Sequence, residues 1–148
     1  MIIYNGTKSQ FIKDFDDGLL IRTIRENLLK KLGRHTGTSE LRSWQNSLPY
    51  MYVVLADKKI PDDAGIAIEY NIPHTSKRVD FIISGYDRDS KPAAVIIELK
   101  QWDKLKAVED SALVETFTGG ANRRVVHPSY QAWSYTALLK AVPEQENR

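Results

Sequence analysis

Apolar residues recur at helical spacing in two segments of the first third of the chain. Residues 19–33 place leucines and isoleucines three and four positions apart, with Gly33 as a stop, and predict a helix. Residues 40–57 show the same period, and Ser39 or Thr38 could cap that second helix. Pro49 falls inside the second segment and predicts a kink or an interruption, which would leave two shorter helices.

Three strand-like segments follow, at residues 65–72, 78–86 and 93–102. Their two connections are short and polar, which favours an antiparallel meander. Alternation in the middle segment places Val79, Phe81 and Ile83 on one face and Asp80 on the other. Residues 103–126 show no clear period and predict mostly loop, with one short strand near residues 114–117.

A last helix is predicted after Pro128, with its apolar side formed by Tyr130, Trp133, Ala137 and Leu138. The polar end at residues 144–148 predicts a frayed terminus. Helices, then strands, then a helix indicate one domain of the α/β (α+β) class over residues 1–148.

Composition narrows the function classes only a little. The chain of 148 residues carries a net charge of +2, so a nucleic acid would have to be held by a local basic patch. The absence of cysteine excludes disulfides and thiolate metal sites. We find neither a signal-peptide core nor an apolar run of about 18 to 20 residues, and we expect a cytoplasmic protein with no membrane partner.

Charged residues interrupt the last two strand-like segments. Glu98 and Lys100 are two positions apart and share a strand face, and a short turn can bring Asp80 to the same row. Two neighbouring carboxylates repel each other unless a cation lies between them. Mg²⁺ or Mn²⁺ suits such oxygen ligands, and the carbonyl of Leu99 could add another. Lys100 could orient a metal-bound water, assist its deprotonation or neutralise charge on a phosphoryl group, so the expected reaction is in-line phosphodiester hydrolysis.

Asp80 followed by Glu98-Leu99-Lys100 resembles the PD-(D/E)XK nuclease superfamily. The resemblance implies an αβββαβ restriction-endonuclease-like core, with a mixed central sheet flanked by helices. Gln131 and Tyr135, four apart on the last helix, resemble the QxxxY motif of the helicase-associated branch. The resemblance implies that these two residues position the active site or a phosphate.

Nearly the whole chain is similar to the N-terminal region of a bacterial family in which a nuclease-like segment precedes a helicase-like ATPase. No GKS or GKT phosphate loop occurs here, so the resemblance implies a separated domain or a shortened relative, with a helicase/ATPase domain as a partner. Val79 replaces the usual proline before the first acid. The last strand of the core would have to come from residues 103–126 or a partner chain, or the domain lacks it.

An acid from an early element often completes such a site. Glu40 is favoured because the SELRSW segment resembles the corresponding family segment, and Glu26 and Glu69 are the alternatives. Arg123 and Arg124, beside two glycines, predict a phosphate-contacting loop. His127 shares the helical face of Gln131 and is a candidate nucleic-acid contact, with a helix-start residue or a metal ligand as the alternatives.

We therefore expect a nuclease that depends on Mg²⁺ or Mn²⁺ and acts on DNA more than on RNA. Two other functions remain open. One is a catalytically inactive module of the same fold that binds nucleic acid or a helicase partner. The other is a homo-oligomerisation domain that completes its sheet through a neighbour's edge strand. In the simplest alternative, Asp80, Glu98 and Lys100 form only a structural salt bridge.

Overall fold

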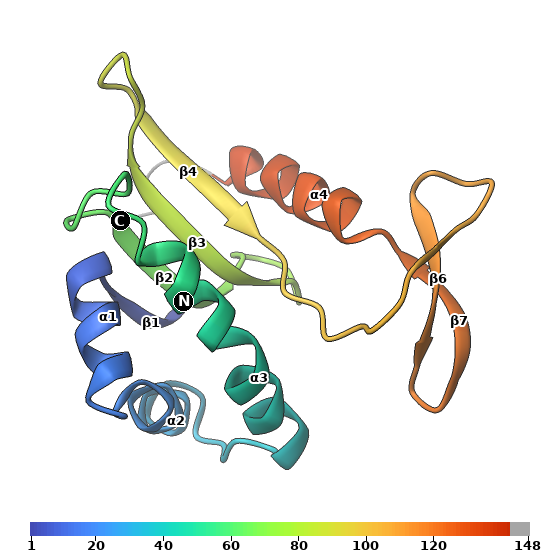
Figure 1. The fold of residues 1–148 in the computed structure, drawn as a ribbon, viewed down its shortest axis with the longest axis horizontal. Helices are drawn as coiled ribbons and strands as arrows, with labels where there is room; N and C mark the ends of the chain where they lie inside the picture. The colour runs from blue at the N-terminus through green and yellow to red at the C-terminus, as the bar shows by residue number, and fades with distance from the viewer. Residues whose placement is uncertain (143–148) are drawn as a thin grey trace.

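A four-stranded sheet with helices on both faces forms the body of the molecule (Figure 1). The computed structural model describes residues 1–142. The first half contains β1 (Ile2–Thr7), α1 (Lys8–Asp16), α2 (Leu20–Leu32) and α3 (Thr38–Leu55). The rest contains β2 (Gly65–Asn71), β3 (Arg78–Tyr86), β4 (Pro92–Ile97), β5 (Lys106–Ala107), β6 (Leu113–Thr118), β7 (Ala121–Val126) and α4 (Pro128–Ala141).

The main sheet has the strand order β1-β2-β3-β4, and each of these pairs is antiparallel. The predicted α+β class and the meander of β2, β3 and β4 are therefore confirmed. The expected mixed sheet is wrong for the described residues. The sequence did not predict β1, which adds to the sheet beside β2, or α1, which follows it. Between residues 1 and 142, no helix is long and apolar enough to cross a membrane.

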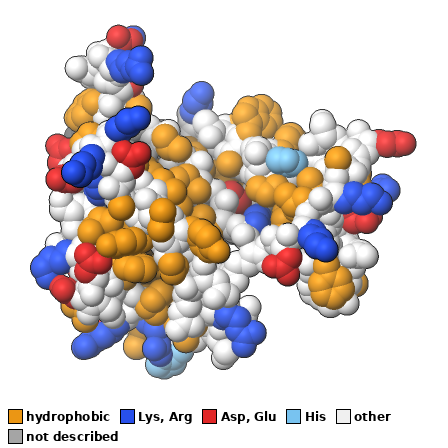
Figure 2. All heavy atoms as spheres, viewed as in Figure 1, with side chains coloured by type: hydrophobic (Ala, Val, Ile, Leu, Met, Phe, Trp, Pro, Cys, Tyr) orange, Lys and Arg blue, Asp and Glu red, His pale blue; other side chains and the backbone are white. Residues whose placement is uncertain are grey.

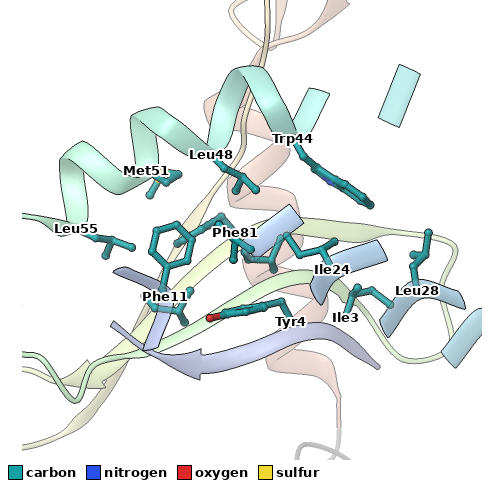
Figure 3. Close-up of a cluster of buried hydrophobic side chains, with 13 residues drawn as sticks. Ile3, Tyr4, Phe11, Ile24, Leu28, Trp44, Leu48, Met51, Leu55 and Phe81 are labelled. Carbon is teal, nitrogen blue, oxygen red and sulfur yellow. The ribbon is translucent and has the colours of Figure 1, made fainter. Parts of the chain in front are cut away.

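The hydrophobic core lies between α1, α2, α3 and one face of the sheet. Figure 3 shows Phe11, Ile24, Leu48 and Phe81 pointing into it from helices and sheet. Each is at most 1% exposed, and full burial of such a side chain contributes about 1.5 to 3 kcal/mol. α4 covers the other face (Figure 1). There Tyr135 packs in a second cluster. Helices thus cover both faces of the sheet around its middle strands.

The alternation of side chains breaks where β2 and β3 pair. On β2, Ile68 packs in the main core but Tyr70 packs with the cluster under α4, because Glu69 between them has a φ of +57°. Their partners on β3 behave alike: Phe81 packs in the main core and Val79 under α4. The prediction that Val79 and Phe81 share a face is therefore wrong. A positive φ is strained for a residue with a Cβ, at roughly 1 to 3 kcal/mol.

The helix predictions hold with local corrections. α2 ends at Leu32 with Gly33 in the left-handed conformation, as predicted. α3 continues through Pro49 without interruption, and Gly37 rather than Ser39 or Thr38 is its N-cap, with no side-chain hydrogen bond. Burial of Leu48 and neighbouring side chains on the sheet offsets the hydrogen bond that a proline removes.

α4 begins at Pro128, as predicted, but it buries a different side. Tyr130 and Trp133 are 46% and 64% exposed, whereas Tyr135 is buried and Leu139 packs beside it. The predicted apolar side is therefore wrong. Size and apolar character alone did not show which side of this helix meets the sheet.

Residues 103–126 form more structure than predicted. β6 confirms the short strand near residues 114–117, and it pairs with β5 and β7 in a separate three-stranded sheet. Gly119 and Gly120 make the β6–β7 turn with φ of +59° and +82°, which glycine adopts without strain. Figure 1 shows this small sheet projecting from the body, so it does not supply the missing strand of the main sheet. The predicted frayed end at 144–148 lies outside the described residues.

Candidate functional site

Asp80 and Glu98 meet where β4 leaves the sheet. Phe81 pairs with Ile97, so the next residues in this antiparallel register are Asp80 and Glu98. The backbone N–H of Leu99 donates to Asp80 Oδ2 at 2.9 Å, in place of a ladder bond to a backbone carbonyl. β4 accordingly ends at Ile97, whereas the sequence predicted a strand to residue 102. The predicted proximity of Asp80 to Glu98 is confirmed.

The two oxygens of the Glu98 carboxylate differ in their surroundings. Oε1 accepts hydrogen bonds from Lys100 Nζ at 2.7 Å and from Gln131 Nε2. Oε2 is buried and has no hydrogen-bond partner among the described residues. The Glu98 side chain is only 4% exposed, so water does not replace the missing partner freely. A buried acceptor without a hydrogen bond costs free energy of folding. Because a second carboxylate lies beside it, a positively charged group at this position would stabilise the site.

α4 borders the site together with β3 and the end of β4. Gln131 Nε2 also donates to Tyr135 Oη at 2.9 Å, which confirms that these residues share one helical face. Tyr135 is buried and holds α4 against the sheet. His127 is the N-cap of α4, and its Nδ1 accepts from the Ser129 N–H at 3.1 Å, so it begins the helix. The helix thereby fixes the direction from which Gln131 approaches Glu98.

Burial and like charge disfavour ionisation of both acids. Burial raises the pKa of Glu98 to about 7, and repulsion by the Asp80 carboxylate adds to the effect. Lys100 acts in the opposite direction but does not cancel it. Burial also raises the pKa of Asp80, against the hydrogen bond from Leu99 and the charge of Lys100. The positive charge of Lys100 therefore does not offset the burial of the two carboxyl groups.

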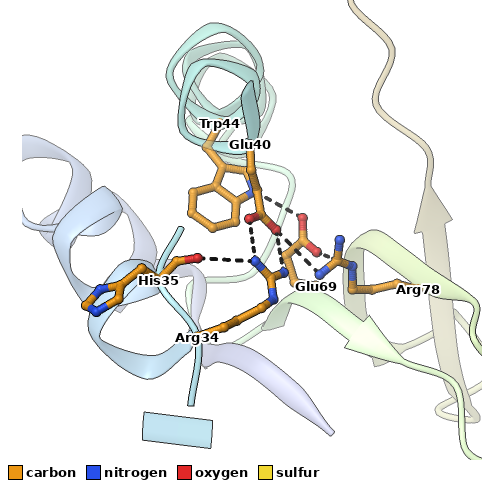
Figure 4. Close-up of polar contacts among 6 residues, drawn as sticks. All are labelled: Arg34, His35, Glu40, Trp44, Glu69 and Arg78. Carbon is orange, nitrogen blue, oxygen red and sulfur yellow. Dashed lines mark hydrogen bonds and ion pairs between the residues drawn. The ribbon is translucent and has the colours of Figure 1, made fainter. Parts of the chain in front are cut away.

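Glu69 lies on the other side of Asp80 and was only a lesser candidate in the sequence. The β2–β3 register places it opposite Asp80, and its side chain is 9% exposed. Trp44 Nε1 donates to Glu69 Oε1 at 3.0 Å, and Arg78 Nε lies 2.6 Å from Oε2 (Figure 4). The Arg78 contact is an ion pair, and Glu69 Oε2 accepts no hydrogen bond from the described residues. Burial nevertheless raises the pKa of Glu69.

Glu40, the favoured third acid, does not join the Asp80–Glu98 pair. Its oxygens accept from the two terminal nitrogens of Arg34 at 2.9 and 3.0 Å, and Arg78 lies 3.6 Å away (Figure 4). Arg34 holds the pKa of Glu40 below its usual range. Glu26 pairs with Arg22 on the exposed side of α2. Of the three candidate acids, the register puts Glu69 next to Asp80.

Arg123 and Arg124 lie on β7 in the projecting sheet, not in a loop. Arg123 pairs with Thr116 and Arg124 with Glu115 across the β6–β7 hairpin, so the two side chains leave opposite faces. Neither contacts the Asp80–Glu98 pair. The predicted phosphate-contacting loop is therefore wrong in its conformation, although both residues remain exposed.

The residues at this site fit a hard divalent cation in chemistry. Glu98 Oε2 is an open buried acceptor, and Asp80 brings a second carboxylate. Within residues 1–142, no group of three or more histidine, aspartate or glutamate side chains is arranged to hold a metal. A cation here would therefore need backbone oxygen and water as well, and Mg²⁺ commonly retains several waters. The Leu99 carbonyl is the backbone group that the sequence suggested for this role.

Comparisons with known proteins do not assign this chain to a family. No family model, no curated protein and no solved structure matches it. The geometry around Asp80 and Glu98 is thus the basis for any functional assignment.

Proposed function

We propose that this protein is a nuclease that requires Mg²⁺ or Mn²⁺ and hydrolyses phosphodiester bonds, preferably in DNA. The observation that supports this best is Glu98 Oε2, a buried and unpartnered acceptor beside the Asp80 carboxylate. A purely structural salt bridge would satisfy both acids. Here Lys100 and Gln131 satisfy only one Glu98 oxygen.

Asp80, Glu98 and the Leu99 carbonyl are the groups that would hold the cation. When bound, the cation would lower the pKa of a water and polarise a phosphoryl oxygen. The Leu99 N–H keeps Asp80 oriented, and Gln131 keeps Glu98 oriented. Gln131 is a positioning residue, because it acts through Glu98.

Lys100 is the catalytic residue that supplies a positively charged side chain, in addition to the metal ion. Its ammonium group lies 2.7 Å from Glu98 Oε1, and its side chain is 26% exposed, so it borders both the acids and solvent. From this position it can orient the attacking water and neutralise charge that develops on the phosphoryl oxygens. The proton released by the water leaves to solvent, which reaches the exposed side of Lys100.

The test is cleavage of labelled single-stranded and duplex DNA and RNA with Mg²⁺ or Mn²⁺. Lys100→Ala should reduce the rate by about 100-fold or more, which is typical for loss of an acid–base or charge-stabilising group. Lys104→Ala, at an exposed lysine four residues further on, is the matched control. Its rate should stay close to that of the unaltered protein.

Equal cleavage by Lys100→Ala and the unaltered protein would contradict the proposed role. Unchanged thermal unfolding midpoints would show that the variants keep the fold. Binding of nucleic acid without hydrolysis under any divalent ion would instead support the catalytically inactive module.

A further inference from the structure

A cleft opens next to Lys100, between α3 and the segment that leaves β4. Its volume is about 570 Å³, which lies within the range of clefts that bind small ligands. Its walls include Asn46 and Tyr50 from α3 and Lys100, Gln101 and Trp102 from the segment after β4. Figure 2 shows the surface hollowed between the body and the projecting sheet, with charged side chains in the recess. The cleft thus begins at the proposed catalytic lysine.

Two aromatic side chains border this cleft. Tyr50 is 75% exposed on α3, and Trp102 is half-buried, with Lys100 Nζ 5.7 Å from the centre of its ring. Neither ring makes a ring–ring contact within the described residues, unlike Phe11, Phe15 and Tyr52 in the core. Aromatic faces of this kind stack on nucleobases.

An amide pair connects the two walls. Asn46 Nδ2 donates to Gln101 Oε1 at 3.0 Å, which joins α3 to the segment after β4. Among the described residues, this leaves Asn46 Oδ1 as an acceptor and Gln101 Nε2 as a donor for a ligand. Amide side chains hydrogen-bond to base edges in this way, and Lys100 supplies positive charge for an adjoining phosphate.

We propose that this cleft binds one unpaired nucleotide next to the scissile phosphate, with its base against Trp102 or Tyr50. This choice of ligand rests on the proposed nuclease function. A base inside a duplex is stacked and paired, so it could reach the cleft only after it leaves the helix. The substrate class is therefore single-stranded nucleic acid, or a frayed or flipped nucleotide in a duplex.

Binding without cleavage tests the cleft directly. The full chain in EDTA is titrated with a short labelled oligodeoxyadenylate, with an abasic oligomer of equal length and charge, and with a blunt duplex. The oligodeoxyadenylate should bind about tenfold or more tightly than the abasic oligomer, because base stacking contributes on that scale. Tryptophan fluorescence should be quenched by the oligodeoxyadenylate and not by the abasic oligomer.

Trp102→Ala should reduce affinity for the oligodeoxyadenylate about tenfold and leave affinity for the abasic oligomer unchanged. Trp133→Ala is the matched control, since Trp133 is 64% exposed on α4 and does not line the cleft. Asn46→Ala provides a second variant that keeps both aromatic rings. It should also weaken binding of the oligodeoxyadenylate selectively, by several-fold.

The outcomes separate this inference from the nuclease function. Equal affinity for the oligodeoxyadenylate and the abasic oligomer, or tighter binding of the blunt duplex than of the single strand, would overturn the cleft proposal. Metal-dependent cleavage could still be observed in that case. Base-dependent binding that requires Trp102, without cleavage under any metal, would support the cleft and contradict the nuclease.

Discussion

Two buried glutamates flank Asp80 in the sheet, and they have very different surroundings. Glu69 lies opposite Asp80 on β2, and Glu98 follows β4 on the other side. Both are less than a tenth exposed, and burial raises the pKa of both. Position in the sheet and burial alone would therefore suggest the same role for the two residues.

Their partners distinguish them. Each Glu69 oxygen has a positive or donating neighbour, because Trp44 contacts Oε1 and Arg78 contacts Oε2. Glu98 concentrates its donors on Oε1 and leaves Oε2 open. Glu69 also sits at a strained φ of +57° and links α3 to the sheet. We infer that Glu69 organises the fold around Asp80, whereas Glu98 keeps an acceptor for a ligand.

The largest expected effect comes from removing each carboxylate in turn. Glu98→Gln should lower metal-dependent cleavage by about 100-fold or more, because one proposed metal ligand is lost. Glu69→Gln keeps an oxygen for Trp44 and should retain cleavage within about tenfold. It should instead lower the free energy of unfolding by about 1 to 3 kcal/mol, because Arg78 loses its charged partner. Cleavage rates and urea unfolding of both variants measure this difference.

Equal loss of cleavage in the two variants would break the comparison. It would place Glu69 in the catalytic site together with Asp80. An unchanged rate for Glu98→Gln would exclude Glu98 from metal binding.

A smaller effect is expected when the donor to Glu69 is removed. Trp44→Phe keeps an aromatic ring in the core but deletes the indole N–H that bonds to Glu69 Oε1 at 3.0 Å. Loss of a donor to a buried carboxylate should destabilise the protein by about 1 to 3 kcal/mol. Trp133→Phe, at an exposed position on α4, should change stability by less than about 0.5 kcal/mol. Urea unfolding of the two variants provides the measurement, and equal stability losses would show that the Trp44–Glu69 bond contributes little.

The arrangement around Asp80 and Glu98 could be predicted from residues that are close together in the sequence. The loop at residues 87–91 is short, so the β3–β4 register could be counted from it, and Gln131 and Tyr135 are one helical turn apart. These relations depend on local geometry, which the sequence encodes directly. The predicted proximity of the acids and the shared helical face therefore hold.

The Glu69 side could not be predicted in the same way. The positive φ at Glu69 turns Tyr70 and its partner Val79 toward α4 instead of the main core. Glutamate rarely adopts this conformation, and the sequence has no glycine or asparagine at this position that would predict it. The Trp44–Glu69 contact depends on how α3 packs on the sheet, which is tertiary information, and the Arg78–Glu69 contact depends on the local distortion where β2 pairs with β3. β1 was missed because its apolar positions are few and its pairing with β2 joins distant parts of the chain.

A change of stability with pH is also expected in the metal-free protein. The folded-state pKa of Glu98 is about 7, above its ordinary value of 4.5, so the folded protein binds more protons than the unfolded chain between these pH values. The free energy of unfolding should therefore fall as pH rises from about 4.5 to about 7 and level off above that. The raised pKa of Asp80 and of Glu69 acts in the same direction, whereas the lowered pKa of Glu40 acts below this window.

Glu98→Gln should make the upper part of this pH dependence shallower, because it removes the carboxyl group whose pKa lies at about 7. Saturating Mn²⁺ should have the same effect in the unaltered protein, because a bound cation favours the ionised carboxylate. Urea unfolding at several pH values, with and without Mn²⁺, measures both changes. If Glu98→Gln left the pH dependence of the free energy of unfolding unchanged, the titrating group would be a residue other than Glu98. The raised pKa of Glu98 would then be contradicted.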